Sequence, residues 1–433
     1  MPFELQADGP RKIAVIGAGI SGMGAAYGLS KAHRVTLIES EPRLGGHART
    51  LIAGKRGDQP VDTGFLVFNY ANYPLMAKLF DDLSVPVVKS DMSFGASIKG
   101  GQLEYALASL DAVFAQRRNF ANPKFLRMLR DVFHFNANAV RVANIDRTAT
   151  VGDFLKELRT GAWFRDYYLL PLSGAIWSTP TEKIMDFPAH AMVQFFENHA
   201  LLNYSGQHQW YTVQGGSVEY VRRLEAAMRQ RGVDIRVGSP VQEVTRTDGA
   251  VQIKLQGAAW ESFDEVVFAT HSDDSLQMLG DALPHEVRAL GAVKYQPNDV
   301  VLHCDEAIMP KRRKVWSSWN YTEDASVKDD TIDLTYWINK LQPIPMDDPH
   351  FVTLNSKRTI REELIYDQTV LRHPVYDLAA LAAQDAVRQF NGTANTWFCG
   401  AWMRNGFHED GLASAVEVTD AIARKDAAQI AAE

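Results

Sequence analysis

Residues 12–29, KIAVIGAGISGMGAAYGL, join a short apolar run to a glycine-rich turn and then to a segment of small residues. This order predicts a strand, a tight turn and a helix. The glycines have the spacing GxGxxG, and each has a different expected role. Gly17 makes the turn, Gly19 lets a pyrophosphate approach the backbone, and Gly22 lets the helix pack on the strand. The phosphates are expected at the helix start, where free N–H groups and the helix dipole favour negative charge.

A carboxylate follows the next predicted strand. Residues 35–38, VTLI, are mostly apolar and are followed by Glu39, 20 residues after Gly19. A carboxylate at this position binds the ribose diol of a dinucleotide. A lone GxGxxG could be a purely structural turn, but the turn and the carboxylate together predict a dinucleotide-binding domain.

The composition excludes several classes of protein. A chain of 433 residues is too long for one hydrophobic core, so we expect two domains. The net charge of −7 argues against a general nucleic-acid binder, and we expect no nucleic-acid partner. Cys304 and Cys399 form no CxxC pair, so a disulfide framework, a zinc site and a dithiol centre are not expected, and we predict no metal site.

The dinucleotide-binding part of the chain is interrupted. A second glycine cluster, RLGGHART at 43–50, precedes VDTGF at 61–65. From about residue 71 to 209 the pattern is helical and aromatic, with few strand signals. Strands are then predicted at 233–237, 251–255, 264–270, 300–304, 334–338 and 351–354, and helices at 218–228 and 413–424. We therefore predict a discontinuous nucleotide-binding domain (1–70, 210–280 and 385–433) and a substrate-binding domain (71–209 and 281–384).

This order of segments resembles the flavin-containing amine oxidase superfamily, which includes phytoene desaturases and protoporphyrinogen oxidases. The resemblance implies an α/β fold: a Rossmann-type FAD-binding domain with an inserted α+β substrate domain. It also implies FAD in the first site. A single dinucleotide fingerprint disfavours a reductase that takes electrons from NAD(P)H. By position, Glu39 would bind the adenosine ribose, Arg43, Gly45 and Gly46 would lie along the pyrophosphate and ribityl chain, and the backbone of Val241 would meet adenine.

The same resemblance places the start of the last helix, at Gly411 and Leu412, at the pyrimidine edge of the flavin, where negative charge develops on reduction. Two positions depart from the family pattern. His47 stands where the family usually has arginine, and Arg49 is the residue that could supply the missing charge. Alanine follows Gly400, where the family often has an acidic residue. The predicted FAD-binding residues are Gly17, Gly19, Ile20, Ser21, Gly22, Glu39, Ser40, Arg43, Gly45, Gly46, His47, Arg49, Thr63, Gly64, Phe65, Val241, Ala269, Gly400, Gly411 and Leu412.

Two further segments narrow the resemblance. GFHEDGLASA at 406–415 and VDTGFLVFNYANYP at 61–74 resemble a bacterial group of FAD-binding proteins associated with lipid-modifying methyltransferases. Within that group the chain is similar to the methyl-branched fatty-acid desaturases of furan fatty-acid synthesis. This implies a lipid substrate, either a fatty acyl chain or a phospholipid. Three alternatives stay open: a flavin amine oxidase acting on a small amine, a flavin-dependent isomerase of unsaturated lipids or sugars, and a non-catalytic flavoprotein.

Residues just before the predicted last helix are candidate proton acceptors. A desaturation releases a proton as well as a hydride, and His408 or Glu409 could take that proton. The structural alternative is a capping carboxylate, for which Asp410 is well placed, with the histidine bonded to backbone. Asn69 and Tyr70 are further candidates for the substrate pocket.

The segment from 161 to 211 is rich in aromatic residues and has only four acidic ones. We expect most of these aromatic side chains to fill a helical core and the remaining few to line an apolar tunnel. A polyamine oxidase would carry acidic residues along its substrate route, so the composition favours an apolar substrate without excluding amines. The aromatic residues are Trp163, Phe164, Tyr167, Tyr168, Trp177, Phe187, Phe195, Phe196, Tyr204, Trp210 and Tyr211.

Two stretches are candidates for membrane contact. Residues 114–135 carry five basic residues and one acidic residue, and on a helix Phe125 and Met128 share an apolar face with basic residues opposite. Residues 311–316 read KRRKVW. The alternatives are a solvated helix face and a charged loop. The first residues, MPFELQADGPRK, lack the order of a signal peptide, and no apolar run spans a bilayer. We expect a cytoplasmic protein with peripheral contact at the inner membrane face; a homodimer is left open.

Overall fold

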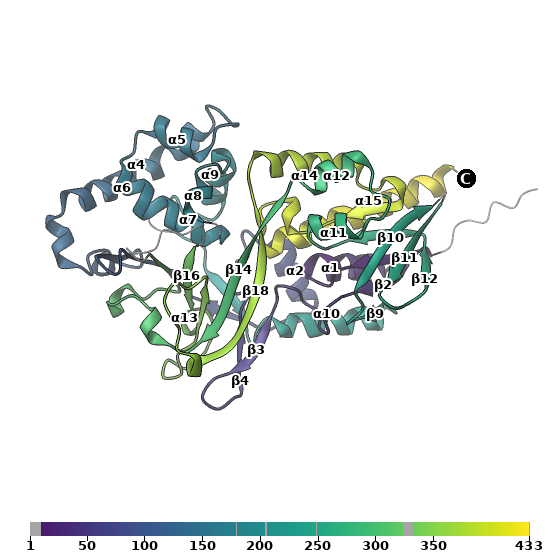
Figure 1. Cartoon of the computed structure of the whole chain (residues 1–433), viewed down its shortest axis with the longest axis horizontal. Helices are drawn as coiled ribbons and strands as arrows, with labels where there is room; N and C mark the ends of the chain where they lie inside the picture. The colour runs from purple at the N-terminus through teal and green to yellow at the C-terminus, as the bar shows by residue number, and fades with distance from the viewer. Residues whose placement is uncertain (1–9, 179, 204–205, 248, 324–331, 433) are drawn as a thin grey trace, which may run out of the picture.

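The computed structural model describes residues 10–178, 180–203, 206–247, 249–323 and 332–432, with residues 429–432 as backbone only. The predicted features at residues 1–9 and Tyr204 lie outside these ranges. Figure 1 shows a nucleotide-binding part around α1 and α10, a large sheet around β14 and β18, and a separate lobe of helices around α4 and α5.

A five-stranded parallel sheet forms the centre of the nucleotide-binding part. Ile16, Ile38 and Phe268 lie side by side in its register, so three strands end together beside the glycine turn. Three separate stretches of the chain supply the strands. In sheet order they are β19 (Thr396–Phe398), β13 (Glu265–Phe268), β1 (Lys12–Ile16), β2 (Arg34–Ile38) and β9 (Asp234–Arg236).

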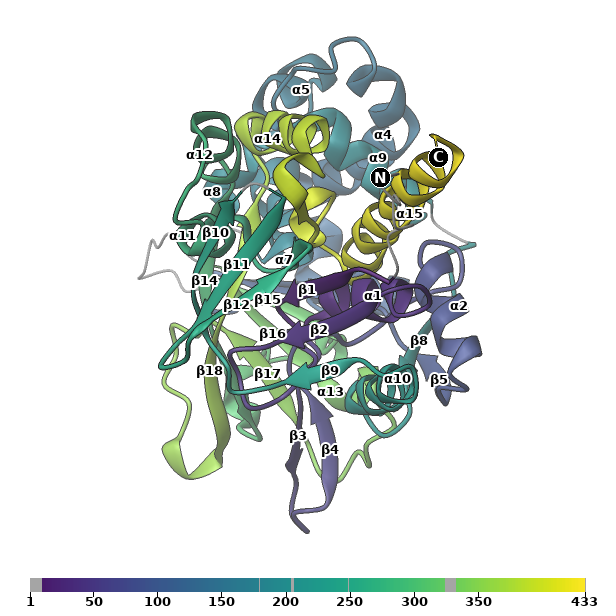
Figure 2. The ribbon, with the colours of Figure 1, turned by 90° about the vertical axis from the view of Figure 1, so that its right-hand side faces the viewer.

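Both faces of this sheet are covered (Figure 2). Ile13 and Val15 pack against helices, whereas Ala14 and Ile16 pack against a β-meander, as the alternation of side chains along a strand requires. Burial on both faces explains why β1 is a continuous apolar run. The helical layer contains α1 (Ile20–Leu29), α10 (Val218–Gln230) and α15 (His408–Ala432). The opposite layer contains β10 (Val241–Thr247), β11 (Ala250–Leu255), β12 (Trp260–Phe263), α11 (Ser272–Met278), α12 (Pro284–Leu290) and α14 (Leu378–Phe390).

Helices α1 and α15 pack closely because glycines on α1 face side chains on α15. A Cβ on Gly24 would lie 2.6 Å from Cδ1 of Leu412, and a Cβ on Gly28 would lie 2.9 Å from Cγ2 of Thr419. A Cβ on Gly411 would lie 2.8 Å from Oγ of Ser21. The first turns of the two helices are therefore neighbours.

The inserted domain is built on a seven-stranded mixed sheet. All its neighbouring strands are antiparallel except β6 and β15, which are parallel. In sheet order the strands are β18 (Ile365–Val375), β14 (Lys294–His303), β17 (Phe351–Leu354), β16 (Asp333–Trp337), β15 (Trp319–Thr322), β6 (Phe94–Ile98) and β7 (Leu103–Ala106). Shorter elements connect it to the nucleotide-binding part: β3 (Thr50–Ala53), β4 (Gln59–Asp62), α2 (Pro74–Asp82), β5 (Val87–Ser90), β8 (Trp210–Val213) and α13 (Ile338–Leu341).

The helical lobe is a bundle with an aromatic core. Its helices are α3 (Leu110–Val113), α4 (Pro123–Ala143), α5 (Val151–Leu158), α6 (Ala162–Phe164), α7 (Leu170–Trp177), α8 (Thr181–Ile184) and α9 (Ala189–Asn198). Six of the predicted aromatic residues are buried there: Phe164, Tyr168, Trp177, Phe187, Phe195 and Phe196. The apolar face of α4 that was a candidate for membrane contact is instead packed into this core, because Phe125 and Met128 are fully buried, so this face is not available to a membrane.

The predicted mixed α/β architecture with an inserted α+β domain is confirmed. Several element predictions need correction. The region 71–209 contains β5, β6 and β7, where few strand signals were found, and β18 was not predicted. The last helix begins at His408, five residues before its predicted start. Within the described residues, no helix is both long and apolar enough to cross a membrane.

Candidate functional site

The glycine turn places open space at the start of α1. The backbone N–H of Gly17 donates to the carbonyl of Ile38 at 2.8 Å, and Gly17 has a φ of +95°, which favours glycine. A Cβ on Gly22 would lie 1.7 Å from the carbonyl oxygen of Gly17, whereas a Cβ on Gly19 would meet nothing within 4 Å. No side chain of the described residues caps the helix at Gly19. Buried residues Ile20 and Ser21 follow directly, so N–H groups face a free volume that suits a phosphate group.

Glu39 closes this turn from the end of β2. Its Oε2 accepts a hydrogen bond from the N–H of Ala18 at 2.6 Å, and its Oε1 accepts from Ser40 Oγ at 3.1 Å. The N–H of Ser239 donates to the carbonyl of Glu39 at 2.8 Å, which brings the start of β10, with Val241, beside this carboxylate. The structure thus brings together the residues assigned to the adenosine end.

The second glycine cluster rests on the first. The N–H of Gly45 donates to the carbonyl of Ala18 at 2.8 Å, and a Cβ on Gly46 would lie 3.0 Å from Cα of Gly19. A Cβ on Gly64 would lie 1.9 Å from the carbonyl oxygen of His47. The lack of side chains at Gly46 and Gly64 therefore lets three backbone segments meet.

Residues at the ends of β13 and β19 lie next to the glycine turn and α15. The N–H of Ala269 donates to the carbonyl of Ile16 at 2.8 Å. The N–H of Gly400 donates to Oγ of Ser414 on α15 at 2.9 Å. Gly411 donates its N–H to the carbonyl of Phe407 at 3.0 Å, so this group is used inside the helix. Gly411 and its neighbour Leu412 pack α15 on α1, and the free first turn expected at these two residues lies at His408 instead.

Both nearby arginines are engaged with other groups of the protein. The guanidinium of Arg43 donates to the carbonyl oxygens of Gly46 at 2.9 Å and Ala48 at 3.3 Å, and so supports the second glycine turn. The guanidinium of Arg49 forms a two-bond ion pair with Asp367 on β18, at 2.8 and 3.2 Å, and donates weakly to Oγ1 of Thr63 at 3.4 Å. Arg49 is therefore engaged at the contact between domains, and its role toward FAD stays a prediction.

Three histidines gather around position 47. The ring of His47 lies 6.0 Å from the ring of His271 and 5.5 Å from that of His373. Nε2 of His47 is buried and has no hydrogen-bond partner among the described residues. Burial lowers the pKa of His271 and of His373 to about 3, and it also lowers the pKa of His47, so all three rings are neutral at pH 7. A buried nitrogen without a partner suits a polar ligand group placed there.

Sequence reasoning missed His271 and His373. His271 follows the predicted strand 264–270 directly, and ligands of open parallel sheets gather beyond the carboxyl ends of the strands, so this position carried a usable signal. His373 lies on β18, which was not predicted. Asn298 places its Nδ2 2.9 Å from Nδ1 of His373 and so orients that ring.

His408 begins α15 and lies against the same segment as His47. Its ring stacks on Phe65, with 4.0 Å between centroids and 16° between planes. Phe65 in turn donates its N–H to the carbonyl of His47 at 2.9 Å. Nε2 of His408 is 3.0 Å from the hydroxyl of Tyr220, and burial lowers the pKa of His408 to about 3. The structure therefore joins His408, Phe65 and His47 in one wall.

Glu409 is turned away from that wall. Its two carboxylate oxygens accept the N–H groups of Leu75 and Met76, each at 2.9 Å, at the start of α2. The neighbouring carboxylate of Asp410 accepts the N–H of Phe407 at 2.9 Å. Both carboxylates are thus engaged with backbone, and the capping role considered for Asp410 alone extends to Glu409.

Asn69 and Tyr70 occupy different environments. Asn69 is fully buried; its Oδ1 accepts the N–H of Asn72 at 2.8 Å, and its Nδ2 has no partner in the described part of the chain. Tyr70 is 46% exposed, with its ring edge against Tyr211. The structure therefore does not bring these two side chains together.

An aromatic stack adjoins His408. The ring of Phe407 stacks on Phe195 of α9 with 4.9 Å between centroids, and Phe195 stacks on His199 at 3.8 Å. The ring of Trp210 lies 6.1 Å from His199. This aromatic cluster connects the start of α15 to the helical lobe.

One cluster of a histidine and two aspartates in the described residues has the spacing of a metal site, but an arginine forms ion pairs with both aspartates. Ligand atoms of His271, Asp273 and Asp274 lie within 4.8 Å of one another. The guanidinium of Arg372 lies 2.6 Å from Asp273 and 2.5 Å from Asp274, and so compensates both carboxylates.

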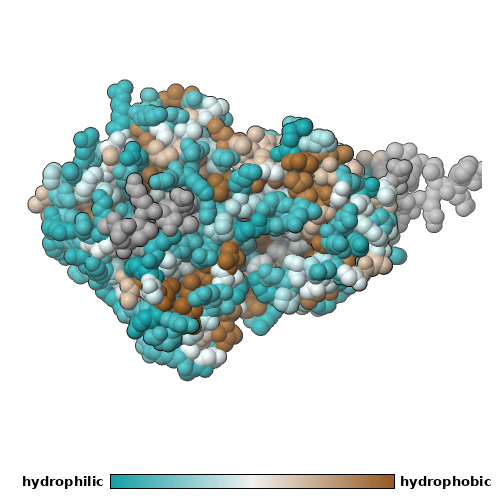
Figure 3. Space-filling model, viewed as in Figure 1, coloured by the Kyte–Doolittle hydropathy of each residue, from teal (hydrophilic) through white to brown (hydrophobic). Residues whose placement is uncertain are grey.

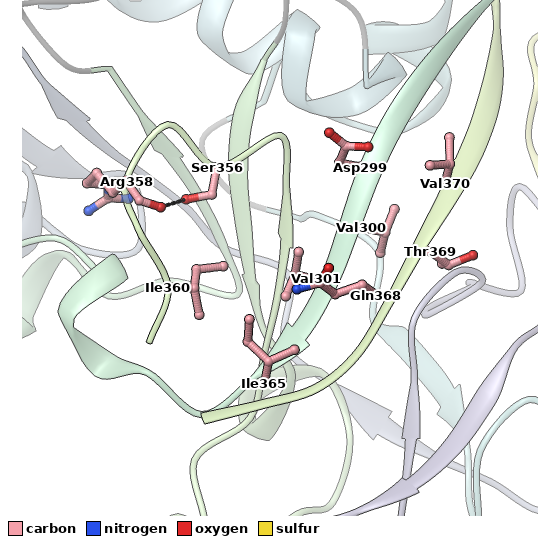
Figure 4. A pocket seen from close by; sticks show the side chains of 10 residues that line it. All are labelled: Asp299, Val300, Val301, Ser356, Arg358, Ile360, Ile365, Gln368, Thr369 and Val370. Carbon is pink, nitrogen blue, oxygen red and sulfur yellow. Dashed lines mark hydrogen bonds between the residues drawn. The ribbon is translucent and has the colours of Figure 1, made fainter. Parts of the chain in front are cut away.

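A separate pocket opens on the seven-stranded sheet (Figure 4). It lies between β14, β18 and residues 356–360, and none of its lining residues belongs to the predicted FAD set. Figure 4 shows Val300 and Thr369 on the two strands and Arg358 and Ser356 on the facing segment.

The chain was compared with known proteins. A model of the family "Flavin containing amine oxidoreductase" matches residues 20–337. The chain belongs to this family. Its cofactor is FAD, and the uncapped start of α1, the open volume at Gly19 and the buried nitrogen of His47 fit that group.

The relatives give less detail than the family. The L-amino-acid oxidase of Gloydius blomhoffii is 47% identical over 49 residues, which are 11% of this chain; the match spans only about a tenth of the length of that curated relative. Two solved structures share the fold. The CLA-producing fatty acid isomerase from P. acnes is 14% identical, with a TM-score of 0.67 over 97% of this chain and 99% of that one. The cyclohexylamine oxidase from Brevibacterium oxydans IH-35A is 15% identical, with a TM-score of 0.64 over 96% and 99%.

Proposed function

We propose that this flavoprotein desaturates a methyl-branched unsaturated fatty acyl chain, carried on a phospholipid, on the way to a furan fatty acid. The aromatic stack of Phe407, Phe195, His199 and Trp210, which leads to His408, is the observation that carries the proposal. The resemblance of residues 61–74 and 406–415 to the desaturases of furan fatty-acid synthesis supports the same substrate class.

Desaturation removes a hydride and a proton from the acyl chain. A methyl branch beside an existing double bond makes neighbouring C–H bonds allylic. One C–H bond gives a hydride, which FAD accepts when bound, and an adjacent or vinylogous C–H bond gives a proton, so that a conjugated diene forms. The chain must therefore hold the substrate, exclude water and accept the proton.

In this proposal His408 accepts the proton. Burial raises the pKa of Tyr220 far above its ordinary value, so its hydroxyl stays protonated and fixes the imidazole through Nε2. When Nε2–H donates to that hydroxyl, Nδ1 is left as the acceptor. Burial keeps the ring of His408 neutral, so this nitrogen carries a free lone pair.

An amine oxidase is less well supported. An amine substrate favours carboxylates along its route, but the acidic residues of the segment 161–211 lie elsewhere. Glu182, Asp186 and Glu197 are exposed, and Asp166 is paired with Arg165 at 2.6 Å. The two carboxylates nearest His408 along the chain are engaged with backbone N–H groups.

An isomerase of unsaturated lipids is the second candidate, favoured by the same apolar stack and by the likeness of fold to the fatty acid isomerase. Anaerobic incubation with methylated unsaturated phospholipids distinguishes the desaturase from the isomerase. Flavin absorbance and lipid mass are followed together. A desaturase bleaches the flavin while the lipid loses two hydrogens. An isomerase leaves the lipid mass and the final flavin absorbance unchanged. Bleaching by small amines, but not by lipid, contradicts the proposal.

A further inference from the structure

Two basic segments that are distant in sequence lie side by side. The single-turn helix Arg313–Val315 packs on α3, and Nζ of Lys314 lies 2.9 Å from the carboxylate of Asp111. Ala106, Ala112 and Val315 form a small buried cluster beneath this contact. The surface formed by residues 107–133 and 306–316 is called the lobe tip below.

The lobe tip is strongly basic. Its two segments carry nine basic and three acidic residues, a formal charge of +6 within a chain of net charge −7. One of the acidic residues, Asp131, is buried. Lys124 and Arg127 are exposed, and no carboxylate of the described residues lies within 4 Å of either. The tip therefore presents cations that the protein itself does not neutralise.

Exposed apolar side chains lie among these cations. Of 16 exposed large hydrophobic residues in the described chain, five fall between residues 107 and 133, so they are concentrated here. Leu110 is 81% exposed and Phe120 is 56% exposed; the ring of Phe120 stacks on Phe114 at 4.0 Å, which holds it in place. Figure 3 shows hydrophobic residues between hydrophilic ones over the lobe.

Helix α4 places one of its faces at the tip. Leu126, Arg130 and Phe133 follow one another at helical spacing on the side opposite the buried Phe125 and Met128. The helix therefore sends one apolar stripe into the core and presents a mixed apolar and basic stripe outward.

We propose that the lobe tip docks on the surface of an anionic lipid membrane. Cations attract the acidic headgroups, while Leu110, Phe120 and Leu126 enter the boundary between headgroups and acyl chains. A nucleic acid would satisfy the charge but would leave these apolar side chains in water, so the mixed character of the surface favours lipid. Docking does not depend on the substrate proposed above, because the lobe tip does not include the site around His47 and His408.

The test is sedimentation of the full-length FAD-loaded protein with vesicles. We expect binding to vesicles that contain phosphatidylglycerol, little binding to pure phosphatidylcholine, and weaker binding as salt rises. The double variant Lys124→Glu with Arg127→Glu should lower vesicle affinity by roughly tenfold or more, and Leu110→Ser by several-fold even at high salt. Arg312 is unsuitable for charge reversal, because its guanidinium lies 2.7 Å from the buried carboxylate of Glu104.

The matched control is Lys31→Glu with Arg56→Glu, which makes the same change of charge at exposed positions outside the tip. The control variant should bind vesicles like the wild type, and all variants should keep the wild-type FAD content. Equal loss of binding in the control overturns the proposal, as does absence of sedimentation at low salt. Binding to duplex DNA as tight as to vesicles, and insensitive to Leu110→Ser, shows a polyanion site and also overturns it. None of these readouts uses turnover, so they are separate from the test of the desaturase.

Discussion

The carboxylate of Glu409, in the first turn of α15, accepts the backbone N–H of Met76, in the first turn of α2, at 2.9 Å. The N–H of Leu75 donates to the other oxygen of the same carboxylate, so Glu409 serves as the cap of a helix more than 300 residues away in sequence. This geometry separates the roles of the two residues that were equal candidates for the base.

Glu409→Gln should therefore act on stability. An amide offers one acceptor where two N–H groups need one each, and loss of a helix cap costs about 0.5–2 kcal/mol. We expect a lower midpoint in urea unfolding, with FAD content and anaerobic flavin reduction close to wild type. A decrease of a hundredfold or more in the reduction rate at unchanged stability would assign the base to Glu409 instead.

His408→Ala should act on the reaction. Removal of a positioned proton acceptor lowers rates by about 10²–10⁴. We expect anaerobic reduction of the flavin by methylated lipid to slow by this range while FAD stays bound, measured by stopped-flow absorbance. Tyr220→Phe is the companion variant, because it keeps the ring edge beside Phe65 but removes the hydroxyl that fixes His408. Wild-type reduction in His408→Ala contradicts the assignment, and loss of FAD shows a structural role.

Gly19→Val should remove FAD without unfolding the protein. A Cβ at Gly19 meets no protein atom within 4 Å and the residue has an ordinary negative φ, so a side chain there is tolerated by the fold but fills the volume of the pyrophosphate. Circular dichroism and the flavin-to-protein ratio check both parts. Gly22→Val is the contrasting variant, since its Cβ would lie 1.7 Å from a carbonyl oxygen and should disrupt the fold itself. Full FAD content in Gly19→Val would place the cofactor elsewhere.

The buried histidines around His47 should make stability depend on pH. Burial lowers the pKa of His373 to about 3, below the ordinary value near 6.5, so the unfolded chain binds the proton that the folded chain does not. The contribution of this histidine to the free energy of unfolding is therefore highest above pH 6.5, and it falls as the pH falls toward 3. Between pH 7 and pH 5 one such histidine lowers the free energy of unfolding by at most about 2 kcal/mol.

His373→Gln removes that titration. Urea unfolding at pH 7 and pH 5, with FAD in excess, should show a smaller loss of stability in the variant than in the wild type. Asp410, whose pKa burial raises to about 6, acts in the opposite direction below pH 6 and is common to both proteins, so the comparison cancels it. An identical pH dependence in the two proteins contradicts a neutral buried His373.

The sequence was sufficient for features whose cause is local. The strand, turn and helix of residues 12–29 follow from a buried apolar run and glycines that meet backbone at short range. The start of α15 was misplaced because Gly411 looks like the open beginning of a helix, whereas its missing side chain serves contact with Ser21. The strand β18 was not predicted because its residues alternate between exposed and half-buried positions and include Pro374.

Contacts between distant segments were beyond reach of the sequence. The pairing of Arg49 with Asp367 joins residues 318 positions apart, and no local pattern distinguishes that arginine from one aimed at a cofactor. The meeting of His47 with His373 likewise depends on where β18 crosses the second glycine cluster. Charge and residue type identified the candidates, but only the packing of the domains decided their partners.

The contact of Gly28 with Thr419 has a consequence for how cofactor affinity can change in this protein. Because the side chains of Leu412 and Thr419 on α15 pack directly against Gly24 and Gly28 of α1, the two helices are held together away from the glycine turn as well. A methyl group added at Gly28 would push α1 and α15 apart at that end and shift the first turn of each helix, although it touches nothing near the phosphates. Mutations that tune FAD retention can thus arise at the remote end of a helix pair, where a survey limited to the binding pocket would not look.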